Sequence, residues 1–123
     1  MSERSIGIRV SITRYVSDDP QPGIVECGFF DAHNRYWNFI EKVPIVSRED
    51  LHAGTTYPRA GVIACEIVGR QLNAAGESII VVDTERVWHV HSIDNVSEFE
   101  LLPSSLVEWD RTSNTEREWN GDV

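Results

Sequence analysis

Lysine is the scarcest charged residue in this sequence. Lys42 is the single lysine among 11 basic residues, and the arginines are scattered from Arg4 to Arg117 without forming a run. Against them stand 20 acidic residues, which give a formal net charge of −9. Such a field repels a phosphate backbone unless a basic patch compensates for it locally. The composition therefore argues against nucleic acid as a partner. It favours a basic protein, because the negative charge would speed the association of such a protein with this chain.

Cysteine is also scarce, since Cys27 and Cys65 are the only two and no Cys-x-x-Cys motif is present. Each lies within an apolar stretch typical of a strand, where a free cysteine behaves as a small buried hydrophobic residue. In a reducing compartment we expect both to be core thiols. A disulfide would require their strands to be neighbours and stays the alternative. An inward position also argues against a catalytic thiol, which needs an exposed, electropositive setting.

Long apolar runs are missing, and none approaches the roughly 20 residues that cross a bilayer. The first residues, MSERSIGIRV, carry Glu3 and Arg4 and do not form a secretory signal. We therefore expect a cytoplasmic protein without a membrane partner. The glycines are isolated rather than gathered in a phosphate-binding loop, and no pair of nucleophile and base stands out. The pattern indicates no cofactor and favours a protein that is not an enzyme.

What the sequence has in abundance is the two-residue alternation typical of half-buried strands. Residues 6–13 alternate apolar and polar side chains, and the two prolines within residues 17–23 then end this strand. Three hairpins are predicted after it: residues 24–30 with 36–46, residues 62–72 with 78–84, and residues 86–93 with 96–102. One or two short helical turns are expected, at residues 47–54 and 103–109.

The chain length of 123 residues suits a single domain with one hydrophobic core. Six or seven strands with turns at this spacing predict an all-β fold, and closing the sheet would remove its edges. We therefore predict a small antiparallel barrel formed by residues 1–109, with a β-sandwich as the alternative. Residues 110–123 are polar and lack periodicity, which predicts a disordered C-terminal tail.

The stretch VWHVHSIDNVSEFELL contains two histidines one residue apart, followed by two glutamates with the same spacing. If Asp94-Asn95 forms a two-residue turn, His91 faces Glu98 and His89 faces Glu100 across the hairpin. These outward pairs would form a solvated face stabilised by opposite charges. The inward face would be apolar and would hold Trp88, Val90, Phe99 and Leu101.

The alternative is a metal site, because imidazole and carboxylate groups are suitable ligands for zinc. Its candidate ligands are His89, His91, Glu98 and Glu100. The His-x-His on a strand is similar to that of the cupin barrels, which add a glutamate and a distant histidine. No histidine follows His91 in this chain, so the resemblance covers two residues. Neighbours on one face of a strand lie about 6.5–7 Å apart, and we therefore favour the solvated face.

Apolar residues also occur at positions that should face outward. Phe30 opposes Tyr36, Ile40 lies on the same side of that hairpin, and Tyr57 lies in a loop. Such a group predicts an exposed protein-binding patch. The other interpretation, which we favour, is that the short helix or residues 106–109 cover this group, because exposed patches on soluble monomers are usually small.

Three functions are compatible with this sequence. The favoured one is a non-catalytic, acidic protein-binding module that uses Phe30, Tyr36, Ile40 and Tyr57, in the manner of small immunity or inhibitor proteins that engage basic partners. The main alternative is a metal-dependent enzyme or small-ligand barrel built around the His-x-His strand. The third is an accessory domain that forms a homo-oligomer through an edge strand. Fold alone does not decide among them.

Overall fold

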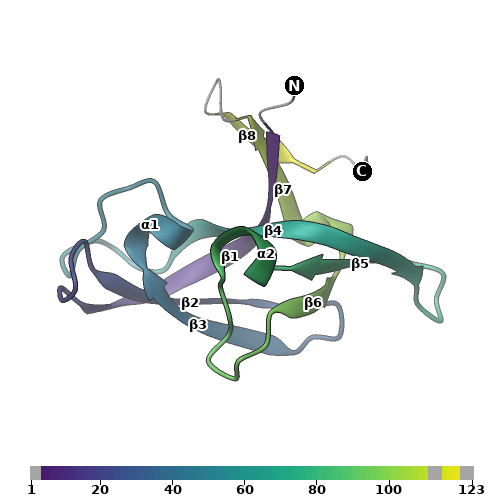
Figure 1. Ribbon diagram of the computed structural model, residues 1–123, viewed down its shortest axis with the longest axis horizontal. Helices are drawn as coiled ribbons and strands as arrows, with labels where there is room; N and C mark the ends of the chain where they lie inside the picture. The colour runs from purple at the N-terminus through teal and green to yellow at the C-terminus, as the bar shows by residue number, and fades with distance from the viewer. Residues whose placement is uncertain (1–3, 111–114, 120–123) are drawn as a thin grey trace.

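The computed structural model describes residues 4–110 and 115–119. They form a curled antiparallel sheet with short helical turns (Figure 1). In chain order the elements are β1 (Arg4–Ser17), β2 (Ile24–Phe30), β3 (Tyr36–Lys42), α1 (Val43–Val46), β4 (Arg59–Leu72), β5 (Ser78–Asp83), α2 (Glu85–Trp88), β6 (Glu98–Leu101), η1 (Pro103–Ser105), β7 (Leu106–Asp110) and β8 (Thr115–Glu118). The strand order is β3-β2-β1-β4-β5-β6, with β7 beside β1 and β8 beside β7. This arrangement confirms the predicted all-β, barrel-like single domain.

The two longest strands, β1 and β4, have 14 residues each and pair with different neighbours along their length. The first half of β1 lies between β4 and β7, and its second half pairs with β2. Register shifts interrupt the β1–β2 ladder between Ile12 and Arg14 and the β4–β5 ladder between Ile67 and Gly69. Bulges of this kind bend a strand and increase its twist. They explain how a simple alternating sequence produces a curled sheet.

An aromatic cluster fills the core where the two ends of the sheet order meet. The ring centroid of Phe99 on β6 lies 5.2 Å from that of Phe29 and 5.2 Å from that of Trp37. Its distance to the Phe39 centroid is 5.8 Å. Such contacts contribute about 0.5–1.5 kcal/mol each beyond the burial of their area. Phe99 therefore holds β6 against the β2–β3 hairpin.

Cys27 and Cys65 are buried free thiols, as predicted. Cys27 is in register with Ile12 and Cys65 with Ile6, both on β1. These positions on β1 lie about 20 Å apart along an extended strand, which excludes the alternative disulfide. Burial raises the pKa of both thiols to about 12. Neither is therefore a reactive nucleophile near neutral pH.

The predicted disordered tail is wrong for residues 115–119. The chain forms β8 there and pairs with β7, and Arg117 donates hydrogen bonds of 2.8 and 3.0 Å to Glu108 Oε1. Trp119 is 7% exposed, and the Arg70 guanidinium lies 5.2 Å from the centre of its ring. A buried aromatic residue and cross-strand charge pairs thus order a segment whose composition predicts disorder. Asp110 belongs to β7, and the remainder of the predicted tail lies outside the described residues.

Short helical turns occur, one of them at the start of the predicted segment 103–109 and another before the predicted segment 47–54. The helix α1 covers Val43–Val46 rather than residues 47–54, and the chain from residue 103 forms η1 and then β7. Ser47, expected to begin a helix, instead follows α1, and its hydroxyl accepts a hydrogen bond of 3.0 Å from Glu49 N. Within the described part of the chain, no helix has the length and apolar character needed to cross a bilayer.

Candidate functional site

The predicted hairpin of residues 86–102 is wrong, because the chain forms α2 and a loop, and β6 pairs with β5 instead. The cause is Thr84, which is fully buried at the end of β5. Its hydroxyl lies 2.7 Å from the carbonyl oxygen of Val90 and 3.2 Å from that of Ser97. These contacts hold Val90 and Ser97 against the end of β5, and between them a backbone hydrogen bond of 2.8 Å from Ser92 N to Val96 O closes a turn at Asp94-Asn95.

His89 and His91 consequently share a carboxylate that the sequence pattern does not indicate. His89 Nδ1 lies 3.3 Å from Glu85 Oε2, and His91 Nε2 lies 3.1 Å from Glu85 Oε1. Glu100, the expected partner of His89, instead lies 2.7 Å from His33 Nε2 through its Oε1 atom. The His89 side chain is 85% exposed and that of His91 34%. Both imidazoles are thus reached by water, but each has a different partner from the predicted one.

The predicted metal ligands do not form one group. The four candidates were His89, His91, Glu98 and Glu100, and the first two converge on Glu85 rather than on the glutamates of β6. Among the residues that the structure describes, no cluster of three or more His, Cys, Asp or Glu side chains is placed to hold a metal ion. The geometry therefore does not support the metal-dependent alternative.

An exposed apolar surface lies on the outer side of the β2–β3 hairpin. It consists of Phe30, Tyr36 and Ile40, called here the Phe30 surface, with exposures of 62%, 41% and 42%. Phe30 and Tyr36 are in register, and their ring centroids lie 5.0 Å apart in an edge-to-face contact. The Tyr36 ring lies over Gly28, where any side chain would collide with it. Gly28 therefore allows the Tyr36 ring to lie close to the backbone of β2.

A fixed carboxylate lies beside this surface. Glu26, which is in register with Ile40, accepts hydrogen bonds of 2.6 Å from both Arg14 Nε and Asn38 Nδ2. The bond from Asn38 is the main reason that the pKa of Glu26 lies below its ordinary value, and Arg14 acts in the same direction against the effect of burial. The surface thus combines apolar side chains with a carboxylate that stays ionised.

The turn between β2 and β3 is held by Asp31. Its Oδ1 atom accepts hydrogen bonds from His33 N at 2.8 Å and Arg35 N at 3.0 Å, and its Oδ2 atom accepts one from Trp37 Nε1 at 2.8 Å. Burial alone would raise the pKa of this carboxyl, but the three hydrogen bonds outweigh it and lower the pKa. The Arg35 guanidinium also lies 3.9 Å from the centre of the Trp37 ring. Phe30 and Tyr36, at the two ends of this turn, are therefore held on a rigid frame.

Tyr57, the fourth predicted binding residue, lies apart from the Phe30 surface. Its ring is partly buried against the core, and its hydroxyl donates a hydrogen bond of 2.9 Å to the carbonyl oxygen of His52. It interacts with Tyr15, which is in register with Val25 near the opposite end of β2 from Phe30. The structure therefore brings together three of the four predicted residues.

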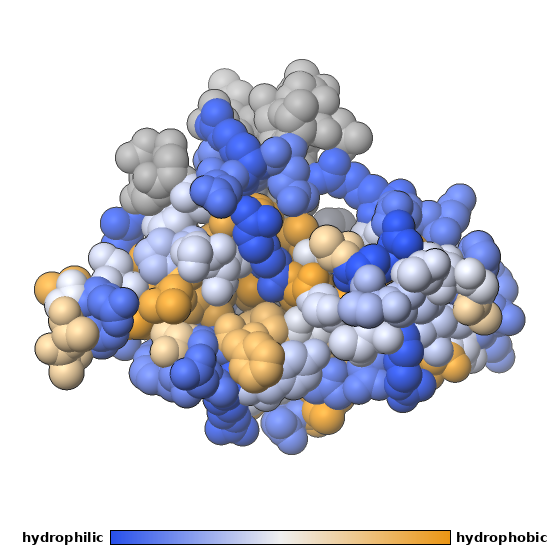
Figure 2. Space-filling view, turned by 180° about the vertical axis from the view of Figure 1, so that it is seen from behind, coloured by the Kyte–Doolittle hydropathy of each residue, from blue (hydrophilic) through white to orange (hydrophobic). Residues whose placement is uncertain are grey.

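The segments expected to cover this surface do not do so. The helix expected at residues 47–54 does not form, and residues 106–109 belong to β7, which pairs with β1. On the face of the molecule opposite to that of Figure 1, hydrophobic residues reach the surface in separate groups with hydrophilic residues around them (Figure 2). The exposures of its three residues show that the Phe30 surface is open to solvent.

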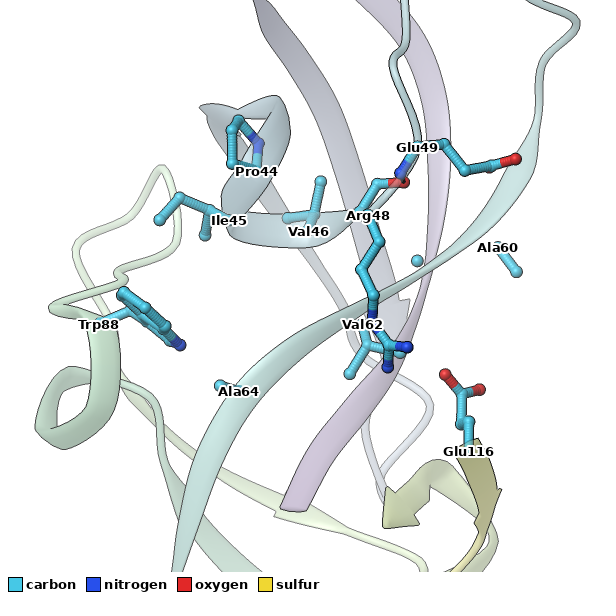
Figure 3. A pocket seen from close by; sticks show the side chains of 12 residues that line it. Pro44, Ile45, Val46, Arg48, Glu49, Ala60, Val62, Ala64, Trp88 and Glu116 are labelled. Atoms are coloured by element: carbon cyan, nitrogen blue, oxygen red, sulfur yellow. Dashed lines mark hydrogen bonds between the residues drawn. The ribbon is translucent and has the colours of Figure 1, made fainter. Parts of the chain in front are cut away.

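A groove between α1 and the outer face of β4 was not predicted from the sequence (Figure 3). Its volume is about 300 Å³, at the lower end of the range for ligand pockets. The strand contributes small apolar side chains to it, namely Ala60, Val62 and Ala64. Their alternation along one strand is the signal that could have indicated a shallow apolar floor.

The two ends of this groove differ in character. Ile45 and Trp88 lie at one end, and at the other Arg48 points toward Glu116 (Figure 3). Trp88 was predicted to face inward together with Val90, Phe99 and Leu101. Those three are buried, but Trp88 is 53% exposed because it ends α2 rather than lying on a strand.

The described residues thus offer two open surfaces, the Phe30 surface and the groove beside α1. Comparison of the chain with protein-family models, with curated proteins and with solved structures finds no match.

Proposed function

We propose that this chain is a non-catalytic, acidic protein-binding module and that the Phe30 surface is its binding site. The observation that carries the proposal is the exposed contact between Phe30 and Tyr36, whose rings stand on a rigid hairpin. Aromatic side chains are enriched at protein interfaces because they bury a large area at a small cost in conformational entropy. Asp31 holds the turn between the two residues, and Gly28 lets the Tyr36 ring lie against β2, which lowers the cost of ordering this surface on binding.

A basic protein is the partner that fits this site. The net charge of −9 would speed the encounter with such a partner and disfavour acidic competitors. The Glu26 carboxylate beside the apolar residues is already held by Arg14 and Asn38, so the attraction to such a partner comes from the net charge. Immunity or inhibitor proteins that neutralise a basic toxin belong to this class of module.

The test begins with capture of proteins from cell extract on the immobilised chain at low salt. Each captured protein is then purified and titrated against the native chain and its variants. We expect Tyr36→Asp or Ile40→Asp to weaken binding about thirtyfold or more, because the new carboxylate would be buried without a partner at the centre of the interface. Isothermal titration calorimetry measures the change.

Leu72→Asp provides the matched control. Leu72 is 71% exposed, but it belongs to the β4–β5 hairpin, so the same substitution there should leave binding unchanged. A partner that binds the Tyr36→Asp chain as tightly as the native chain would show that the Phe30 surface is not the site. Failure to capture any protein would count against the function itself.

Binding of a small ligand is a second candidate function, which the groove beside α1 favours. Its apolar floor and the exposed ring of Trp88 suit an aromatic fragment. Titration with such fragments should shift the backbone NMR signals of Ala60, Val62 and Ala64. The variant Ala60→Trp would fill the groove and abolish these shifts, and shifts that persist in this variant would refute the assignment.

The homo-oligomer predicted as a third possibility is less favoured. The edge strand β8 carries a charged side chain at each residue from Glu116 to Glu118. Natural edge strands use such charges to resist pairing with another copy.

A further inference from the structure

We propose that the line along which the barrel closes is a pH-sensitive latch that His33 holds shut when it is protonated. This line, called here the seam, is where the β2–β3 hairpin meets β6 and the loop that precedes it (Figure 1). No strand pairing crosses the seam within the described residues, because β3 and β6 stand at the two ends of the strand order. Backbone hydrogen bonds cross it from Ala32 N to Glu100 O at 2.8 Å and from Ile93 N to Asn38 O at 2.9 Å.

A histidine lies beside each of these backbone bonds. His33 is adjacent to Ala32 in the β2–β3 turn, and its Nε2 atom lies 2.7 Å from Glu100 Oε1 on β6. The hydrogen bond with Glu100 is the main reason that the pKa of His33 lies above its ordinary value, and Asp31 in the same turn adds to the effect. A protonated His33 therefore ties the turn to β6.

His91 has the corresponding place at the second backbone bond. Its Nε2 atom lies 3.1 Å from Glu85 Oε1 on α2, and its charge also acts on Glu41 of β3, across the seam. Burial raises the pKa of Glu41, an effect that His91 and Lys42 oppose. His89 shares Glu85 from the solvent side. His91 thus lies between carboxylates on both sides of the seam.

The direction of the pH effect follows from this arrangement. A histidine whose pKa is raised by its folded surroundings stabilises the structure fully below the pKa of the unfolded chain, and the stabilisation is lost as pH rises through the folded-state pKa. Histidine ordinarily titrates near about pH 6.5. The seam is therefore tightest in mildly acidic solution and loosens as pH rises past the pKa of His33. Loosening would free the Asn38 carbonyl and the edge of β3. The latch does not depend on the proposed binding function.

Amide hydrogen exchange measured by NMR tests the latch. After correction for the intrinsic pH dependence of exchange, we expect the protection of the Ala32 amide to fall about twofold to fivefold between about pH 5.5 and 8. Amides within the β2–β3 ladder should keep their protection. A chain with His33→Gln should show the lower protection at both pH values.

His52→Gln serves as the matched control, since the His52 ring accepts a hydrogen bond from Gly54 N within its own loop. This variant should show the same pH dependence of amide protection as the native chain. Equal protection at both pH values in the native chain would overturn the proposal, and so would an undiminished pH effect in the His33→Gln chain. If that variant does not fold, the Glu100→Gln chain decides the matter: its His33 should titrate at a lower pKa than in the native chain, and an unchanged pKa overturns the latch.

Discussion

Asp31 shows how far the β2–β3 hairpin depends on one carboxylate. Replacing it by alanine would leave Trp37 Nε1 and two amides of the turn without their acceptor. Hydrogen bonds to a charged group contribute about 1.5–3 kcal/mol each, and water can replace those made to the exposed amides. We therefore expect Asp31→Ala to lower the free energy of unfolding by about 2 kcal/mol, as measured by urea denaturation.

The pH dependence of this difference provides an internal check. Because the pKa of Asp31 is lowered in the folded chain, its stabilising effect is present above the unfolded value, near about pH 4, and is lost as pH falls through the folded one. The gap between native and Asp31→Ala chains should thus shrink in acid. Asp18→Ala is the control, because the exposed Asp18 accepts a hydrogen bond from Tyr15 but holds no turn amides. Equal stability of native and Asp31→Ala chains at neutral pH would show that the turn is not held in this way.

At the scale of elements, alternation of polarity predicts a strand correctly unless a local hydrogen bond competes with it. The β2–β3 and β4–β5 hairpins lie where the two-residue period places them. The third hairpin fails because the hydroxyl of Thr84 binds two carbonyl groups of the following loop. A polarity pattern cannot reveal such a contact, since the same threonine would suit a strand equally well. The strand β8 was not predicted, because its side chains are polar and show no alternation. It is held instead by pairing with β7, which includes the hydrogen bond from Arg117 to Glu108.

The candidate site could be predicted only where it depends on a single element. Phe30, Tyr36 and Ile40 are exposed because their neighbours Phe29, Trp37 and Phe39 fill the inner face of the same hairpin. The groove depends on where α1 lies against β4, which no local pattern fixes. No local pattern predicts the seam either, because His33 and Glu100 are 67 residues apart in sequence.

For the molecule as a whole, the two buried thiols govern stability in alkaline solution. Burial raises the pKa of Cys27 and Cys65 to about 12 from an ordinary value of 9.0. Above the ordinary value the unfolded chain releases protons that the folded chain retains. The stabilisation from each thiol is therefore full below about pH 9 and is lost as pH rises toward 12. The ionisation of each thiol in the unfolded chain should lower the free energy of unfolding by about 1.4 kcal/mol per pH unit within this window.

Urea denaturation of the native chain and of a chain with Cys27→Ala and Cys65→Ala, between about pH 9 and 11, measures this effect. The variant should be less stable at neutral pH, because removal of two buried sulfur atoms leaves cavities. As pH rises, the free energy of unfolding of the variant should nevertheless fall less steeply than that of the native chain, because two titrating groups are gone. The two slopes should differ by about 2.7 kcal/mol per pH unit. Tyr15 and Tyr57 titrate in both proteins and cancel in the comparison, whereas the loss of Cys27 also removes one of the causes that raise the pKa of Tyr36, after its burial. Parallel slopes would mean that the thiols ionise in the folded chain, and hence that water reaches the core between β1 and its neighbours β2 and β4.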